Sequence, residues 1–139
     1  MNANAPVHRR HLPDVVSEQG SAAVEFVFVG ILITFLTLGV FQLALTLHVR
    51  NTVHDAASEG ARWAALADST PQEGVQRTKD LITVSVGSQF AQDVTATTSM
   101  WLDAPTAVIT VRTSLPVIGL WGFTNTMEVQ GHAATEIIG

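Results

Sequence analysis

The chain has 139 residues, a net charge of −5 and no cysteine. This length allows one small domain with an anchor. The acidic balance provides no basic surface for nucleic acid. The lack of cysteine excludes a disulfide framework, a cysteine nucleophile and thiolate metal sites.

Residues 1–20 are polar, contain two prolines and show no apolar period. We expect them to form an unstructured leader. The sequence then divides into a long helix over residues 21–67 and a small head over residues 68–139. The patterns described below place the whole chain in the α+β class.

Residues 26–49 lie between Glu25 and Arg50 and contain no Asp, Glu, Lys or Arg. A helix of 24 residues is about 36 Å long, enough to cross a hydrocarbon core of about 30 Å. A buried core helix is the alternative, but the residues after Ala67 are too few to cover it on all sides. A cleaved signal peptide would have a shorter apolar core, of about 7–15 residues. We therefore predict a single membrane span that stays attached to the head.

The arginines on the two sides of this span are balanced: Arg9 and Arg10 precede it, and Arg50 and Arg62 follow it. The positive-inside rule therefore gives no orientation from charge alone.

Residues 51–67 continue the helix beyond the membrane as an amphipathic segment rich in small residues. Gly60 in mid-helix costs about 1 kcal/mol relative to alanine. Close approach of another backbone would offset this cost; an alanine-rich, solvated helix with an incidental glycine is the alternative. Arg62 can pair with Glu59 at i, i+3, a surface contact worth roughly 0.2–0.5 kcal/mol. Glu59, Gly60 and Arg62 are candidate contacts for a partner subunit.

A second helix begins after Asp68-Ser69. Thr70 supplies an N-cap hydroxyl, Pro71 occupies the first helical position and Glu73 completes a capping box. The pattern predicts one apolar face along this helix, with Gly87 near its end. This face comprises Val75, Thr78, Ile82, Val86 and Phe90.

The last third of the chain has the two-residue period of strands. We expect strands over residues 94–102, 107–114 and 127–135, with a turn at residues 103–106. The first connection is too short for a crossover, so the strands are antiparallel. The apolar face of this three-stranded sheet should pack on the two helices.

Residues 115–123 are apolar but are interrupted by Pro116, Gly119 and Gly122. We expect a loop that contacts a partner or the membrane, with Trp121 at its centre. A loop folded onto the core of the head is an equal alternative.

The segment Gly20-Ser21-Ala22-Ala23-Val24-Glu25-Phe26 stands directly before the apolar run. It resembles the processing site of type IV prepilins: a glycine, the cleaved bond, a glutamate at the fifth mature position and then the hydrophobic helix. Glycine leaves the bond unhindered, and cleavage would give Ser21 a free α-amine. An ionisable residue such as Glu25 at the start of a span is costly and usually functional. The alternative makes Gly20 a hinge and Glu25 a partner of the helix dipole.

Residues 18–67 as a whole resemble the TadE-like family of the tight-adherence (Flp) pilus system. The residues that carry the resemblance are the glycine–glutamate segment, the anchor, Val49-Arg50-Asn51, and the block Ala56-Ala57-Ser58-Glu59-Gly60-Ala61-Arg62. The head fits the family more loosely. TadE-like and TadF-like subunits both fit these residues.

The resemblance implies a minor pilin or pseudopilin with a cytoplasmic N-terminus and an extracytoplasmic head. It implies processing by a prepilin peptidase between Gly20 and Ser21. It also implies assembly with other pilins and with the Tad assembly platform, through packing of apolar helices and a contact between the Ser21 amine and the carboxylate of Glu25. Phe26 would begin the packing surface.

Two other functions remain open: an uncleaved signal-anchor envelope protein whose head binds a ligand or partner, and a pseudopilin of a secretion or uptake system. No serine lies in a nucleophile elbow and no phosphate-binding loop is present, so we expect no enzyme activity and no small-molecule substrate. His48 and His54 are six residues apart, on nearly opposite helix faces, so we expect neither a metal site nor another cofactor.

Overall fold

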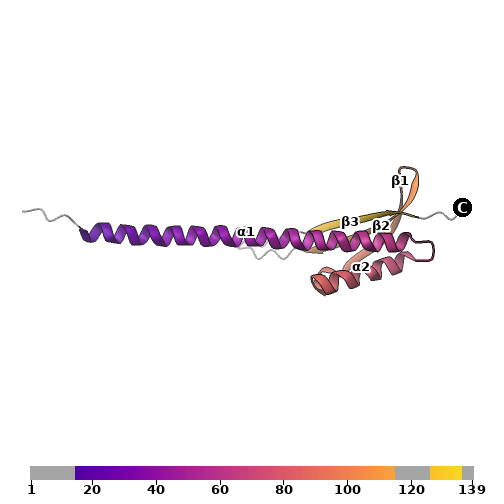
Figure 1. Ribbon diagram of the computed structural model, residues 1–139, viewed down its shortest axis with the longest axis horizontal. Coiled ribbons are helices and arrows are strands. Elements are labelled where there is room, and N and C mark those ends of the chain that lie inside the picture. Colours follow the sequence, from indigo (N-terminus) through magenta and orange to yellow (C-terminus); the bar gives the residue numbers. More distant parts are fainter. Residues whose placement is uncertain (1–14, 115–125, 136–139) are drawn as a thin grey trace, which may run out of the picture. The chain divides into compact units, whose positions relative to one another are not determined.

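A computed structural model describes residues 15–114 and 126–135, with side chains from Gly20 onward. The predicted loop at residues 115–123, including Trp121, lies outside the described residues, as does most of the leader. The order of elements is α1, α2, η1, β1, β2, β3 (Figure 1), so the predicted α+β class is confirmed. By its internal contacts the chain divides into two compact units, residues 1–39 and 40–139.

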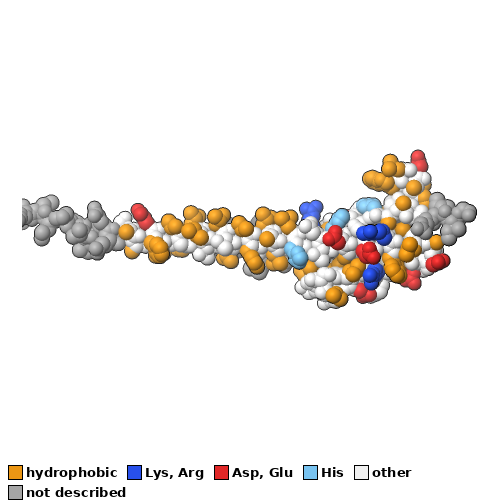
Figure 2. Space-filling view, in the orientation of Figure 1, with side chains coloured by type: hydrophobic (Ala, Val, Ile, Leu, Met, Phe, Trp, Pro, Cys, Tyr) orange, Lys and Arg blue, Asp and Glu red, His pale blue; other side chains and the backbone are white. Residues whose placement is uncertain are grey.

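Helix α1 (Val15–Ala65) carries the anchor. Its residues from Gly20 are long and apolar enough to span a membrane, and the apolar side chains of the anchor are exposed, as Figure 2 shows. We predicted that the helix begins at Ser21, but it already includes Val15, the first residue that the structure describes. The residues between Val15 and Gly20 include no proline, and a glycine inside a helix costs only about 1 kcal/mol, so the helix extends through Gly20.

Helix α2 (Pro71–Ser85) begins as predicted. The Glu73 amide donates to Thr70 Oγ1 at 3.3 Å, and the Thr70 amide donates to Glu73 Oε2 at 2.7 Å, which completes the capping box. The helix ends at Ser85, so Gly87 lies just after its end, as predicted. Gly87 has a φ of 113°, which breaks the helix, and Phe90 belongs to the short 3₁₀ helix η1 (Ser88–Phe90). Phe90 is nevertheless buried in the core.

The strands β1 (Asp93–Trp101), β2 (Ala104–Ser114) and β3 (Thr126–Ala134) form one antiparallel sheet in the order β1-β2-β3, as predicted. The predicted turn at residues 103–106 was wrong. The turn consists of Leu102 and Asp103, both with positive φ, while Ala104 and Pro105 belong to β2. A two-residue turn with positive φ at both positions matches the twist of a hairpin. The sequence did not indicate it because leucine rarely adopts this conformation.

One face of the sheet packs on the helices, as predicted. Its contributors to the core include Val94, Ile109, Val111 and Val129, and the helices contribute Val53, Ala57 and Ile82. Gly131 of β3 lies so close to the backbone of Ala57 that a side chain at this position would overlap it. The second half of α1 is therefore part of the head's core.

Candidate functional site along the anchor helix

Gly20 and Ser21 lie within the first turns of α1, and both are exposed. A Cβ atom added at Gly20 would meet no atom within 4 Å. The packing of this chain therefore does not require glycine at position 20. The bond after Gly20 is helical here, so a peptidase that needs an extended bond would have to unwind this turn, which glycine makes easier.

Glu25 and Phe26 lie one helical turn after Ser21, and both side chains are exposed. Among the described residues, Glu25 forms no hydrogen bond or ion pair. It is also the single acidic residue of the helix from Gly20 to Val49. A carboxylate at the beginning of an apolar helix is unfavourable without a partner, so its presence favours a contact outside this chain.

The family model described as TadE-like protein matches residues 20–62. Residues 20–62 are therefore similar to the TadE-like family over less than a third of the chain. The match confirms the resemblance seen in the sequence and covers the glycine–glutamate segment, the span and the small-residue half of α1. No curated protein and no solved structure matches the chain.

The small-residue end of the TadE-like segment is folded against the head rather than left open. A Cβ at Gly60 would overlap the side chain of Thr78 and lie 2.7 Å from the carbonyl oxygen of Gly74, both on α2. The backbone approach expected at Gly60 therefore occurs within the chain. In this structure the neighbour of Gly60 is α2, not a partner subunit.

Glu59 and Arg62, in contrast, remain on the surface. Arg62 Nε lies 3.8 Å from Glu59 Oε2; the Arg62 side chain is largely exposed and Glu59 is half-buried. This is the i, i+3 pair that the sequence predicted. Their contact with a partner subunit stays a prediction.

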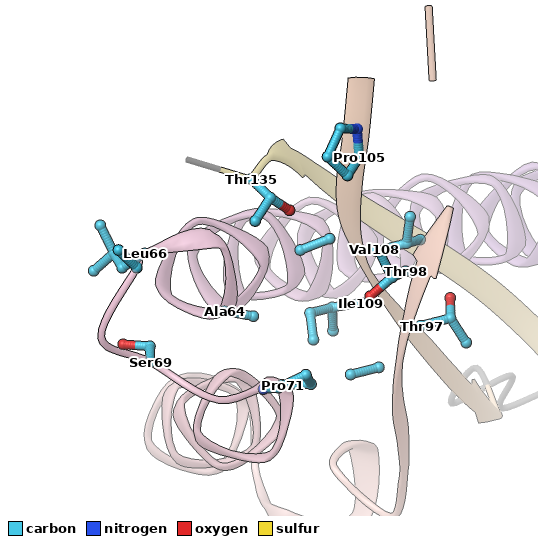
Figure 3. Close-up of a pocket in the computed structure, with 13 residues that line it drawn as sticks. Ala64, Leu66, Ser69, Pro71, Thr97, Thr98, Pro105, Val108, Ile109 and Thr135 are labelled. Carbon is cyan, nitrogen blue, oxygen red and sulfur yellow. The ribbon is translucent and has the colours of Figure 1, made fainter. Parts of the chain in front are cut away.

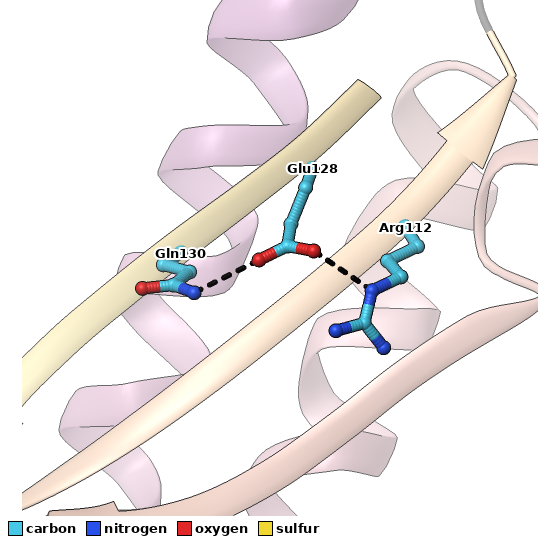
Figure 4. Close-up of polar contacts among 3 residues, drawn as sticks. All are labelled: Arg112, Glu128 and Gln130. Carbon is cyan, nitrogen blue, oxygen red and sulfur yellow. Dashed lines mark hydrogen bonds and ion pairs between the residues drawn. The ribbon is translucent and has the colours of Figure 1, made fainter. Parts of the chain in front are cut away.

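The sheet carries a polar cluster that the sequence analysis did not identify (Figure 4). Arg112 of β2 and Glu128 of β3 are register partners, and Arg112 Nε donates to Glu128 Oε2 at 2.8 Å. Gln130 Nε2 donates to Glu128 Oε1 at 3.0 Å. The hydrogen bond from Arg112 is the main reason that the pKa of Glu128 is lowered, with Gln130 second. The same pair raises the pKa of Arg112.

A groove of about 290 Å³ lies between the α1–α2 connection and the β1–β2 hairpin (Figure 3). Its lining is small or uncharged and includes Ala64, Pro71, Thr98, Pro105 and Ile109. No ionisable side chain lines it among the described residues, so it offers binding surface rather than acid–base chemistry.

The tip of the β1–β2 hairpin is an apolar surface that sequence reasoning missed. Met100, Trp101 and Leu102 are 68%, 61% and 89% exposed. The sequence had instead predicted an exposed apolar surface in the loop around Trp121, which lies outside the described residues. The sequence signal at the tip is the run of three large apolar residues directly before Asp103. This signal indicates an exposed tip only when the turn is placed at Leu102 and Asp103.

Proposed function

We propose that this chain is a TadE-like minor pilin or pseudopilin that a prepilin peptidase processes and that takes part in assembly of a tight-adherence pilus. The observation that carries the proposal is the coincidence of the TadE-like match, residues 20–62, with a helix whose Glu25, at the start of its apolar run, has no partner among the described residues. The processed chain would stay in the membrane as a single-pass protein, with its head outside the cell.

In this mechanism the chain's own residues supply three things. Gly20 gives the peptidase an accessible bond, Ser21 provides the new amine, and Glu25 pairs with an amine inside the packed helices. An ion pair in that apolar setting sets the register between subunits, because a misaligned subunit would leave a charge buried alone. The role is structural, and we propose no catalysis.

The direct test compares the mass of the chain expressed with and without a prepilin peptidase, followed by N-terminal sequencing of the membrane-extracted protein. The proposal expects a shorter chain that begins at Ser21 only when the peptidase is present. A chain of unchanged mass in both strains would contradict it.

The uncleaved signal-anchor protein is the second candidate, and the groove beneath the hairpin favours it. A groove of about 290 Å³ approaches the size of small-ligand pockets. This candidate expects an intact leader and a ligand that protects Thr98 and Ile109 from hydrogen exchange. A pseudopilin of a secretion or uptake system would be processed like a pilin and would be separated from it by the assembly with which it co-purifies.

A further inference from the structure

Two charge-free segments meet at the base of the head. Residues 26–49 of α1 contain no Asp, Glu, Lys or Arg, and neither do residues 81–92, which include the end of α2 and all of η1. Within the unit of residues 40–139 they line a common groove of about 360 Å³. Its walls include Leu45, His48 and Val49 from α1, and Val86, Gln89 and Phe90 from the other segment.

The head's core begins before the apolar run of α1 ends. Val49 is 3% exposed and belongs to the core, and Leu45 is half-buried. Leu45 precedes Arg50 by five residues, which is roughly 7.5 Å of helix. A 24-residue run exceeds a hydrocarbon core of about 30 Å by roughly 6 Å, so with its first residue at one edge of that core its last turn lies at the opposite boundary with the headgroups. The end of α2, which lies beside this turn, is at the same depth.

The side chains exposed at this end of α2 suit an interface with lipid. Val84 is 88% exposed, and the exposed residues beside and beyond it, Thr83, Ser85 and Gln89, are uncharged; Asp80, one turn earlier toward the polar end of α2, is the nearest exposed carboxylate on that helix. The opposite end of α2 carries Gln72 and Glu73 and is polar. In Figure 2 the free end of α2 accordingly shows uncharged and apolar side chains.

We propose that the base of the head, defined as Leu45, Val84 and Val86, rests in the interfacial region of the bilayer that holds α1. The occupant of this surface is lipid, at the boundary between headgroups and acyl chains. The contact is continuous with the anchor, and it holds the head at a fixed depth before assembly. The proposal rests on the membrane anchoring in the proposed function and adds a lipid-binding surface on the head itself.

The natural absence of cysteine makes this surface directly measurable. Full-length, unprocessed chain carrying Val84→Cys is labelled with bimane and placed in nanodiscs of phosphatidylcholine brominated near the top of the acyl chains. Gln72→Cys, exposed at the other end of α2, is the matched control, and Leu32→Cys in the span confirms insertion. An interfacial helix lies roughly 5–10 Å into the boundary, so we expect quenching at position 84 to be at least about twofold stronger than at position 72.

Two further variants test whether the quenching depends on the apolar side chain at position 84 and not on the affinity of the dye for lipid. With the label at Gln89→Cys, the further change Val84→Asp should reduce quenching toward the value at position 72, while Val84→Ile should leave it unchanged. Equal quenching at positions 84 and 72 would overturn the proposal. Exposure of position 84 to water in nanodiscs, with protection only in assembled pili, would also overturn the proposal. The partner of this surface would then be another subunit and not lipid. The nanodisc measurements use no peptidase and no pilus, so their failure leaves the test of processing unaffected.

Discussion

Gly60 of α1 and Thr78 of α2 lie in direct contact, with the Thr78 hydroxyl occupying the space that a side chain at position 60 would need. Thr78 Oγ1 donates to the carbonyl oxygen of Gly74 at 2.9 Å and is fully buried. The two helices therefore meet backbone to backbone, and Gly60 makes this packing possible.

Gly60→Ala should destabilise the head. Overpacking a tight contact typically costs about 1–3 kcal/mol, which exceeds the gain of about 1 kcal/mol in helix propensity. Thermal unfolding of the full chain in detergent, followed by circular dichroism, measures the change. Gly39→Ala is the matched control, since a Cβ there meets no atom within 4 Å. Equal transition temperatures for the two variants would show that α2 can move away at little cost.

Gly20→Val should block processing without affecting folding. A β-branched side chain hinders access to the bond and stiffens the turn that must unwind. The measurement is the mass of the membrane-extracted chain in cells that contain a prepilin peptidase, and the expected product is the full-length precursor. Gly30→Val, also in open space on the same helix, should be processed normally. Normal cleavage of the Gly20 variant would contradict the prediction that the peptidase cleaves between Gly20 and Ser21.

Glu25→Ala should be inserted and cleaved, with a normally folded head, but should fail to support pili or to co-purify with other pilins. Loss of one member of a buried ion pair leaves the other unpaired, at roughly 3–5 kcal/mol. Glu25→Asp should be intermediate because its side chain is shorter. Pilus counts and co-purification are the readouts, and wild-type piliation by the alanine variant would reduce Glu25 to a helix-dipole residue.

Glu128→Gln should make the head less sensitive to acid. The folded pKa of Glu128 is lowered, so its contribution to stability is present above the ordinary value of 4.5 and is lost as the pH falls through the folded pKa. The wild-type head should therefore lose more stability than the variant between neutral pH and pH of about 3. Unfolding temperatures across this range give the comparison, with Asp68→Asn as the control for removal of one surface charge. Parallel pH curves for wild type and Glu128→Gln would contradict the prediction.

A fragment of residues 50–139 should unfold cooperatively, whereas residues 68–139 should not. Val53, Ala57 and Ala61 are fully buried in the head's core, so the shorter fragment loses one wall of that core. A chain of that size without disulfides has a small hydrophobic core, so loss of part of it should abolish cooperative folding. Calorimetry of the two fragments tests this, and a cooperative transition in the shorter one would show that the sheet and α2 suffice.

The sequence by itself determined the parts of this protein that depend on local chemistry. The run from Phe26 to Val49 predicted a helix long and apolar enough to span a membrane, because charge-free length is a sequence property. Thr70, Pro71 and Glu73 fixed the start of α2 because a capping box acts within one turn. The two-residue period of the last third predicted the strands, and the short connection between β1 and β2 predicted their antiparallel pairing.

Only the tertiary structure shows which surfaces are already buried by contacts within the chain. From the sequence, Gly60 indicates only that some backbone approaches closely. The packing identifies that neighbour as α2. Arg112 and Glu128 became partners through the strand register, and Leu102 entered the turn because the hairpin twist outweighs its local preference. The end of α2 meets the apolar run of α1 because the chain folds back. Residues far apart in sequence are brought together by long-range packing, on which local patterns carry no information.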